Sequence, residues 1–392
     1  MKLLIPVAAG LEQTVKRQLA SLGYPDAPAE NGRIRLEGDW QDIARLNVFL
    51  RSGERVLIQL AEFPATTFDE LFDGVYSVAW EHYLSAKSKI LMNGKSVQST
   101  LAAIKASGGV AKKAIIRRLA DKLNMGRTTF SENGERCIVG VSLYKDIATV
   151  TLDTSGDGLH KRGYRSLAYT APIKETLAAG LIDNTFYNPD RDEEKPFADP
   201  FCGSGTIPIE AAMKALHIAP GANRSFDFTE WKCADRGVLA RAKEEANDLR
   251  LRSKKLDIFA SDLNPKAISI AEYHAKQAGV YEFIRFKTAD ARDFKTQKRY
   301  GVLLSNPPYG ERLSDEKEVQ ALMRDLGKTF RALPEWNAYL FTSLPDFERH
   351  FGRHADKKKK MSNANLPCGF YSYFGKPPKA ENPASKNDKN TN

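Results

Sequence analysis

The sequence predicts an α/β protein with a mostly parallel sheet in its second half and a smaller α+β part in front of it. In the second half, short β-rich runs alternate with helical segments, an order typical of a parallel sheet with helices on both faces. The first half alternates strands and helices over a shorter stretch and then becomes strongly basic. A chain of 392 residues suggests two or three domains, each able to bury a core.

Composition favours a soluble protein. Hydrophobic residues make up 42% of the chain, the mean hydropathy is −0.45, and no apolar run approaches the roughly 20 residues of a membrane span. Leu3 to Leu11 resembles a short signal peptide, but Pro6 interrupts this run and Glu12 follows it directly. We therefore expect a cytoplasmic protein.

The cysteine spacing indicates the redox compartment, and the net charge indicates the kind of partner. The four cysteines, at 137, 202, 233 and 368, form no C-x-x-C pair and no metal-ligand spacing, which fits a reducing compartment and predicts no metal site. The net charge of +10 favours a polyanionic partner.

The first 60 residues predict a small α+β module. Hydrophobic spacing and turn residues predict two helices between three strands. Asp39 or Asp42 is expected to cap the second helix. The apolar stripe from Phe63 to Tyr83 is explained by core packing alone. The predicted elements are strands at 2–7, 33–36 and 56–60 and helices at 11–22 and 43–50.

Residues 87–127 are basic, with ten Lys or Arg against one acid, Asp121. A strand is expected from Ile90 to Leu101, and an amphipathic helix from Val110 to Leu123 after Gly108-Gly109. A solvated helix face is the ordinary explanation of a charge run, but a single sign over so long a stretch favours phosphate contact. The candidate contacts are Lys112, Lys113, Arg117 and Arg118.

Strands at 137–143 and 147–153 close this region, and a glycine-rich basic segment, Gly156 to Arg165, follows them. It is either a plain linker or a hinge that touches nucleic acid through Lys161, Arg162 and Arg165.

A glycine turn follows the first short strand of the second half. Pro196 to Ala198 leads into D-P-F-C-G-S-G-T at 199–206, and a helix runs on to Leu216. Such a turn lets a ligand approach the backbone at a helix N-terminus. G-x-G alone is weak evidence, and the missing third glycine argues against NAD or FAD.

Acids end the next two strands. Asp262 follows Asp257 to Ala260, where nucleoside-binding sheets hold ribose hydroxyls, and Asp290 follows the strand at 284–286. Asp290 could accept from an adenine amine. An insertion from about His217 to Gly237 explains the long gap before Asp262. Each acid taken alone could equally be a helix cap.

The stretch Asn306-Pro307-Pro308-Tyr309 ends the fourth strand. The oxygens of Asn306 and Pro307 can accept the two hydrogens of an aryl amine while Tyr309 stacks on the base. Two fixed acceptors would aim the nitrogen lone pair at an electrophile without a strong base. The alternative is a proline-rich turn after a buried strand. These three residues are the candidate catalytic residues.

These motifs, in this order, resemble the class I S-adenosylmethionine-dependent amino-methyltransferases. The quoted stretches are D-P-F-C-G-S-G-T, S-D-L-N-P, T-A-D-A and N-P-P-Y-G-E-R. With L-H-K-R-G-Y-R, A-P-I-K-E and the basic front half, the chain is similar to THUMP-domain RNA methyltransferases of the RlmL type. The resemblance covers about residues 1 to 375.

The resemblance implies a Rossmann-like methyltransferase domain with a seven-stranded, mostly parallel sheet at 156–375. It also implies a ferredoxin-like module at 1–60 and a THUMP domain at 61–155. Residues 376–392 read as a disordered tail. Implied cofactor contacts, for S-adenosylmethionine, are Asp199, Phe201, Cys202, Gly203, Gly205, Thr206, Asp262, Asp290 and Asn306. Some relatives carry a second methyltransferase domain after this one, which this sequence does not supply.

The resulting expectation is an enzyme that methylates the N2 amine of a guanine in 23S ribosomal RNA. The alternatives are a tRNA guanine N2, an adenine N6, or an RNA-binding ribosome-assembly factor without catalysis. The target nucleotide and the oligomeric state are left open by the sequence.

Overall fold

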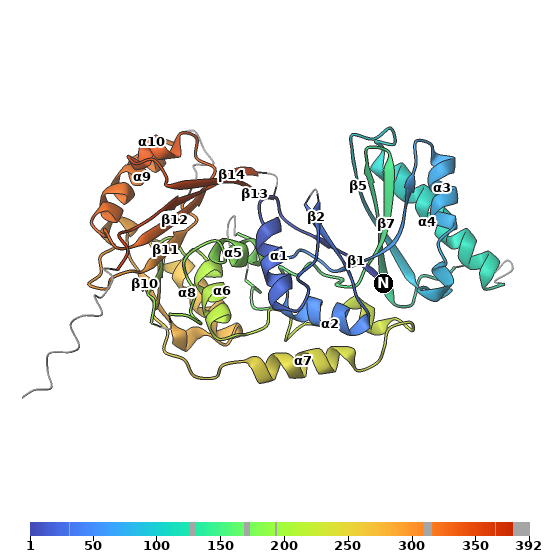
Figure 1. Cartoon of the computed structure of the whole chain (residues 1–392), viewed down its shortest axis with the longest axis horizontal. Coiled ribbons are helices and arrows are strands. Elements are labelled where there is room, and N and C mark those ends of the chain that lie inside the picture. Colours follow the sequence, from blue (N-terminus) through green and yellow to red (C-terminus); the bar gives the residue numbers. More distant parts are fainter. Residues whose placement is uncertain are drawn as a thin grey trace, which may run out of the picture. The chain divides into compact units, whose positions relative to one another are not determined.

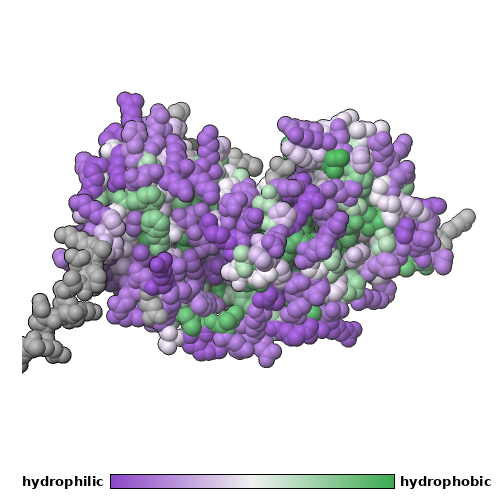
Figure 2. Space-filling view, viewed as in Figure 1, coloured by the Kyte–Doolittle hydropathy of each residue, from purple (hydrophilic) through white to green (hydrophobic). Residues whose placement is uncertain are grey.

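A computed structural model of the chain describes residues 1–30, 32–124, 130–167, 173–192, 194–308, 316–364 and 366–378 (Figure 1). The chain divides into two compact units. The first comprises Met1–Ala168, Lys174–Leu181 and Leu216–Ser253, and the second comprises the remaining residues. Hydrophilic residues cover most of the face drawn in Figure 2.

The first unit contains one seven-stranded sheet with the order β2-β3-β1-β4-β7-β6-β5. Only β5 and β6 pair in parallel; the other neighbours are antiparallel. The strands are β1 (Lys2–Pro6), β2 (Ala29–Glu30), β3 (Arg33–Glu37), β4 (Leu57–Pro64), β5 (Lys89–Val97), β6 (Arg136–Tyr144) and β7 (Ile147–Asp153). The helices are α1 (Glu12–Ser21), α2 (Trp40–Phe49), α3 (Phe68–Tyr76), α4 (Ile104–Lys122), most of α5 (Glu175–Ile182) and α7 (Val238–Leu249).

One face of this sheet is a continuous apolar core. The strand registers pair Ile5 with Ile34, Leu3 with Ile58, and Ile58 with Leu152, and all five side chains are buried. Directly paired residues lie on the same face of a sheet, so this core extends from β3 to β7. Helices α3 and α4 pack against each other, and they also pack against strands of this sheet.

Helix α4 begins earlier than the sequence predicts. It starts at Ile104 and includes Gly108 and Gly109, whereas the expected start was Val110. Two glycines inside a helix cost about 1 kcal/mol each relative to alanine. The buried stripe of Ser107, Ala111, Ala114, Ile115 and Leu119 offsets that cost through packing. In α2 the expected cap is confirmed, because the Asp39 carboxylate accepts from the N–H groups of Gln41 and Asp42.

The insertion is longer than predicted, because Leu216–Ser253 as a whole belongs to the first unit. Helix α7 packs against α2, where the Arg45 guanidinium pairs with Glu245 at 2.8 Å. The ring of Phe228 stacks on Trp40 with centroids 6.2 Å apart, and the Trp231 indole N–H donates to the Arg136 carbonyl at 3.0 Å. We call this segment, residues 216–253, the inserted arm.

The second unit contains the predicted seven-stranded, mostly parallel sheet, with the order β10-β9-β8-β11-β12-β14-β13. The first five strands are parallel, and β14 is antiparallel to both of its neighbours. The strands are β8 (Phe197–Asp199), β9 (Ile258–Asp262), β10 (Ile284–Thr288), β11 (Val302–Ser305), β12 (Asn337–Thr342), β13 (Lys357–Asn363) and β14 (Leu366–Tyr373). The helices are α6 (Thr206–Ala215), α8 (Pro265–Gln277), α9 (Glu316–Arg331) and α10 (Phe347–Phe351).

The strand order reverses between β8 and β11. In open α/β sheets, ligands bind beyond the carboxyl ends of the strands at this reversal. The polar motifs predicted from the sequence follow β8, β9, β10 and β11, so the topology places them along this edge.

The described residues contain neither a membrane-spanning helix nor a cluster of metal ligands. Within them no helix is long and apolar enough to cross a bilayer. They also bring together no group of three His, Cys, Asp or Glu side chains that could hold a metal ion.

Candidate active site at the carboxyl ends of the parallel strands

The glycine turn after β8 is closed by its own backbone. The Gly205 N–H donates to the Cys202 carbonyl at 2.8 Å, and α6 follows at Thr206. Gly205 has φ +85°, and a Cβ on it would lie 2.9 Å from the Cβ of Ala271 on α8. Only glycine satisfies both conditions, so the turn and α8 approach each other closely because of this residue.

Asp262 at the end of β9 organises the turn. Its Oδ2 accepts from the Gly203 N–H at 3.0 Å, and its Oδ1 accepts from the Asn264 N–H at 2.9 Å. The Cys202 N–H donates to the Ser261 carbonyl at 2.9 Å. Helix α8 is capped by Asn264 and not by Asp262. The cap alternative therefore fails for Asp262, and its carboxylate is partly exposed beside the turn.

Asp290 follows β10 and has local partners. Its carboxylate accepts from the Arg292 backbone N–H at 2.8 Å and from the Arg292 Nε at 3.0 Å. The Arg292 side chain lowers the pKa of Asp290, so this carboxyl is ionised. Asp290 also caps a short 3-10 helix, Ala291–Asp293, so here the cap interpretation holds alongside any ligand contact.

Leu263, directly after Asp262, is a site feature that the sequence reasoning missed. Its side chain is 67% exposed, the highest value among the large hydrophobic residues described. An exposed apolar side chain next to a strand-end acid offers a surface for a flat ring. An apolar residue placed directly after the strand-end acid was the signal that could have identified it.

Asp199 and Ser305 join the two central strands at the reversal point. The Ser305 hydroxyl donates to Asp199 Oδ1 at 2.6 Å, and the Phe201 N–H donates to the same oxygen at 3.1 Å. Asp199 is completely buried, and its Oδ2 has no hydrogen-bond partner among the described residues. Burial raises the pKa of Asp199 to about 7, and the negative charge of Asp262 adds to the rise. Ser305 was not predicted as a site residue.

Asn306 and Pro307 follow β11 directly. Asn306 is half-buried and Pro307 is buried, whereas Pro308 is exposed. The amide and the Pro307 carbonyl therefore belong to the same edge as Asp199. Tyr309, the predicted stacking residue, lies outside the described residues.

His274 on α8 forms a hydrogen bond with the glycine turn after β8. It is fully buried, and its Nδ1 lies 3.0 Å from the Ser204 carbonyl oxygen, between the two glycines of the turn. With Nδ1 protonated, the ring donates to this carbonyl and fixes the peptide that precedes Gly205. The sequence reasoning did not identify this residue.

The predicted nucleic-acid contacts on α4 mostly have acidic partners within the first unit. The Arg118 guanidinium forms a two-point pair with Glu81, at 2.7 Å and 3.0 Å, and this pairing lowers the pKa of Glu81 to about 2. Arg117 pairs with Asp121 at 3.0 Å. Lys112 pairs with Glu132 and donates to the Ile90 carbonyl. Lys113 is exposed and has no partner among the described residues.

The three basic residues predicted as contacts in the segment Gly156 to Arg165 differ in their partners and exposure. Lys161 is exposed and pairs with Asp157 at 3.3 Å, and Arg165 pairs with Glu175 at 3.2 Å. Arg162 is only 4% exposed, and its guanidinium donates to the carbonyls of Leu159 and Arg51. This burial does not suit a phosphate contact, so Arg162 serves the fold of the segment.

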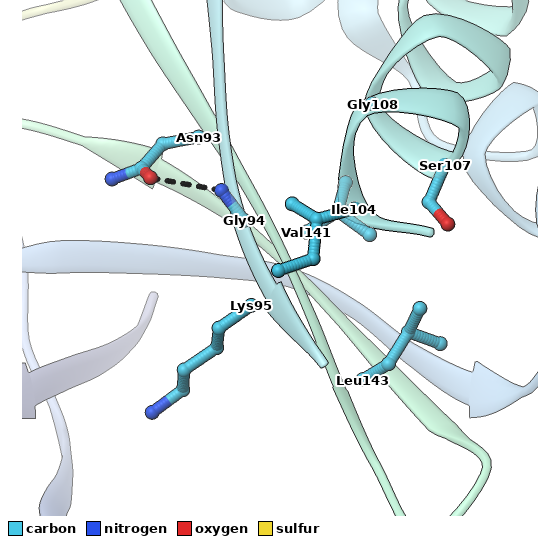
Figure 3. Close-up of a pocket in the computed structure, with 8 residues that line it drawn as sticks. All are labelled: Asn93, Gly94, Lys95, Ile104, Ser107, Gly108, Val141 and Leu143. Atoms are coloured by element: carbon cyan, nitrogen blue, oxygen red, sulfur yellow. Dashed lines mark hydrogen bonds between the residues drawn. The ribbon is translucent and has the colours of Figure 1, made fainter. Parts of the chain in front are cut away.

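A small pocket in the first unit lies between β5 and the first turns of α4 (Figure 3). Its lining is mainly small and apolar, and the Asn93 side chain accepts from the Gly94 N–H at 2.8 Å. The lining residues are Asn93, Gly94, Lys95, Ile104, Ser107, Gly108, Val141 and Leu143. None of its lining residues belongs to the motifs that follow the parallel strands, and we assign no chemistry to the pocket.

The fold and the strand-end motifs define a class of protein, the S-adenosylmethionine-type methyltransferases with an α/β sheet. The chain matches three family descriptions in sequence order. Residues 2–57 match the RlmL ferredoxin-like domain, residues 65–153 the THUMP domain, and residues 162–371 the RMKL-like methyltransferase domain. The chain therefore belongs to the RMKL-like methyltransferase family with a THUMP domain, as the sequence resemblance implied.

Individual relatives cover nearly the whole chain. The chain is 42% identical to the "Putative RNA methyltransferase YpsC" of Bacillus subtilis over 369 residues, 94% of each protein. A solved structure described as "SMU.472, a putative methyltransferase complexed with SAH" is 42% identical, with a TM-score of 0.89, and the match covers 96% of this chain and 99% of that one. A structure from Listeria monocytogenes, described as a "predicted N6-adenine-specific DNA methylase", is 43% identical, with a TM-score of 0.88 and 96% of both chains covered.

Proposed function

We propose that this methyltransferase transfers a methyl group from S-adenosylmethionine to the exocyclic N2 amine of a guanine in 23S ribosomal RNA. The observation that carries the proposal is the position of Asn306 and Pro307. They end β11, the strand next to β8, from which the glycine turn emerges, and Asp199 and Ser305 link the two strand ends at 2.6 Å. A target amine held by Asn306 would therefore lie beside the donor site.

The residues around the turn fit the parts of S-adenosylmethionine. The partly exposed Asp262 carboxylate would accept from the ribose hydroxyls, and Leu263 would cover one face of the adenine. Asp290 would lie near the adenine amine. The buried Asp199 carboxylate has an oxygen without a donor, which a cationic amino group would satisfy. The turn of Phe201, Cys202, Gly203, Gly205 and Thr206 would surround the methionine part.

S-adenosylmethionine supplies a methyl group on a cationic sulfur, which accepts a nucleophile in line with the breaking C–S bond. The chain's own residues hold the amine. The Asn306 side-chain oxygen and the Pro307 carbonyl accept its two hydrogens, so the nitrogen lone pair points toward the methyl carbon. When the new N–C bond forms and the C–S bond breaks, the nitrogen releases one proton to water, because the two amide-type oxygens accept hydrogen bonds but are too weakly basic to take the proton. Most of the rate then comes from positioning.

RNA is the proposed partner, and the exposed basic residues of the first unit are its proposed contacts. Lys113, Arg117 and Lys161 are the exposed members of the predicted set, and of these Arg117 pairs with Asp121 and Lys161 with Asp157. Contacts of this kind position a nucleic acid without reading its sequence. A cytoplasmic location follows from an RNA substrate of this type.

The experiment that tests the proposal is mass spectrometry of modified nucleosides in rRNA and tRNA from cells with and without the gene. Loss of one N2-methylguanosine from 23S rRNA supports the proposal. Loss of an N6-methyladenosine favours the adenine alternative, which the motif and the description of the Listeria relative also allow. Loss of a modified nucleoside from tRNA would identify tRNA as the substrate. If no nucleoside changed, an RNA-binding factor would be the better explanation.

A further inference from the structure

Asp199 connects the two halves of the site through one oxygen atom. Oδ1 receives the N–H of Phe201, which belongs to the glycine turn, and the hydroxyl of Ser305, which is the last residue of β11. Asn306 is the next residue along the chain. One carboxylate oxygen therefore joins the turn that would hold the methyl donor to the strand end that would hold the amine.

The geometry of the Ser305 hydroxyl is specific. Ser305 is completely buried, as is Asp199, so neither group exchanges its partner for bulk water. A hydroxyl that donates to a carboxylate at 2.6 Å is at the short end of the usual range, as expected for a charge-assisted hydrogen bond. The backbone of β11 pairs with β8 at Val302 and Leu303, which precede Ser305 in the strand. The side-chain bond thus continues the connection between the strands beyond their last paired residues.

We infer that Ser305 is a positioning residue for methyl transfer, because its hydroxyl fixes the end of β11, and with it Asn306, relative to the glycine turn. This inference rests on the proposed function. Loss of the hydroxyl would let Asn306 move by a fraction of an ångström while the turn, Asp262 and Leu263 keep their places. Transfer would then slow more than donor binding weakens, because misplacement of the reacting atoms acts on the rate.

A second consequence concerns Asp199. Burial and the charge of Asp262 raise its pKa, whereas the bonds from Ser305 and Phe201 lower it. The Cys202 thiol is the other titratable group facing this carboxyl, and burial keeps that thiol neutral. Removing the Ser305 hydroxyl takes away a bond to the ionised form, so the pKa of Asp199 rises further. Binding of a cationic amino group to the ionised Asp199 carboxylate would then require a higher pH.

The test compares Ser305→Ala and Ser305→Thr with wild type and with Ser372→Ala. Ser372 is a buried serine of β14 that makes no contact with Asp199 among the described hydrogen bonds, so it controls for the loss of any buried hydroxyl. Calorimetry measures S-adenosylhomocysteine affinity, and single-turnover assays with saturating S-adenosylmethionine and RNA measure transfer. Both are repeated from pH 5.5 to 8.5.

At pH 8 we expect Ser305→Ala to bind S-adenosylhomocysteine within about threefold of wild type and to transfer methyl at least about tenfold more slowly. The pH at which binding is half-maximal should rise by about one unit. Ser305→Thr, which keeps the hydroxyl, should restore both, and Ser372→Ala should resemble wild type.

Two results would overturn the inference: a Ser305→Ala transfer rate equal to that of Ser372→Ala, or equal losses of binding and transfer with an unchanged pH midpoint. A wild-type protein that bound S-adenosylhomocysteine but methylated no RNA would overturn the proposed function instead. In that case Ser305 would not be a positioning residue for methyl transfer. The pH midpoint of S-adenosylhomocysteine binding would still show whether the Ser305 hydroxyl acts on Asp199.

Discussion

At the residue scale, the burial of Asp199 lowers the stability of the ligand-free protein above neutral pH. Its pKa is raised to about 7 in the folded protein, above that of an exposed carboxyl. The folded state therefore holds this proton more tightly, so the contribution to stability is full below the unfolded pKa and is lost as pH rises through about 7. Strained or unsatisfied groups of this kind are common where a ligand supplies the missing partner.

Asp199→Asn should therefore stabilise the ligand-free protein at pH 8 and weaken donor binding. The amide oxygen can still accept from Ser305 and Phe201, but it carries no charge to be buried. We expect a higher Tm than wild type at pH 8, a smaller difference at pH 5, and at least about tenfold weaker S-adenosylhomocysteine binding. Calorimetry and thermal melts at both pH values measure this. A Tm difference that does not change with pH would contradict the assignment.

Asn306 tests the other side of the site. Asn306→Ala removes one proposed acceptor of the target amine but leaves Asp199, Asp262 and the glycine turn unchanged. We expect transfer to fall by about a hundredfold or more and S-adenosylhomocysteine affinity to stay within a few fold. Single-turnover rates with purified rRNA give the measurement. Full transfer by this variant would show that the amine is held elsewhere.

His274 acts on the turn through the Ser204 carbonyl. Asparagine can place an amide nitrogen near the position of Nδ1, whereas leucine fills the space without a donor. His274→Leu should weaken S-adenosylhomocysteine binding about tenfold, because a buried carbonyl loses its donor and the turn shifts. His274→Asn should recover most of the affinity. Equal affinity of the two variants, measured on folded protein, would argue against this role.

At the element scale, the sequence predicted β8, β9, β10 and β11 and the motifs after them, because each motif directly follows a short apolar run. It missed Ser305 and His274, whose roles depend on contacts with residues 106 and 70 positions away. It also placed the start of α4 too late, since Gly108-Gly109 is locally a helix-breaking pair and only the packed stripe behind it carries the helix through.

Contacts between residues far apart in the chain also explain why the sequence overestimates the free charge on the basic face of α4. Counting charges identified a run of one sign, but Glu81, the partner of Arg118, lies 37 residues earlier in the chain. Charge in a sequence window therefore overstates the charge available to a phosphate. Distinguishing a paired from an available cation needs the tertiary structure.

On this helix, Lys113 and Arg118 should give different phenotypes. Lys113→Ala removes an exposed cation, so RNA affinity should fall and the slope of log affinity against log salt should decrease by about 1. Arg118→Ala leaves Glu81 without its partner, so Tm should fall while the salt slope changes little. Titrations at several salt concentrations and thermal melts separate the two. Identical slopes for wild type and Lys113→Ala would exclude this face as a phosphate contact.

At the scale of the whole molecule, the two units are interlaced along the chain. Most of α5 and all of the inserted arm belong to the first unit, although both lie within residues 162–371, which match the methyltransferase domain. The sequence could not reveal this, because α7 has the periodicity of an ordinary crossover helix between two parallel strands. Its partner is α2, about 200 residues earlier.

This interlacing predicts that residues 162–392 do not behave as an independent domain. Alone, this fragment would expose the buried side chains of Phe228 and Trp231 in the inserted arm and of Leu177 and Leu181 on α5. Apolar surface of that extent in an isolated fragment promotes aggregation. We expect it to be insoluble or to bind a hydrophobic dye strongly.

Co-expression with residues 1–161 should reverse this, because that fragment supplies Trp40, Arg45 and Leu11, which pack against the arm and α5. The two fragments should then co-purify and bind S-adenosylhomocysteine with nearly the affinity of the intact chain. Adding Trp231→Ala to the larger fragment should weaken the association, since it removes both a ring contact and the hydrogen bond to the Arg136 carbonyl. A soluble, monomeric 162–392 fragment with full affinity would mean that the arm and α5 fold without the first unit, and that the methyltransferase sheet does not depend on it.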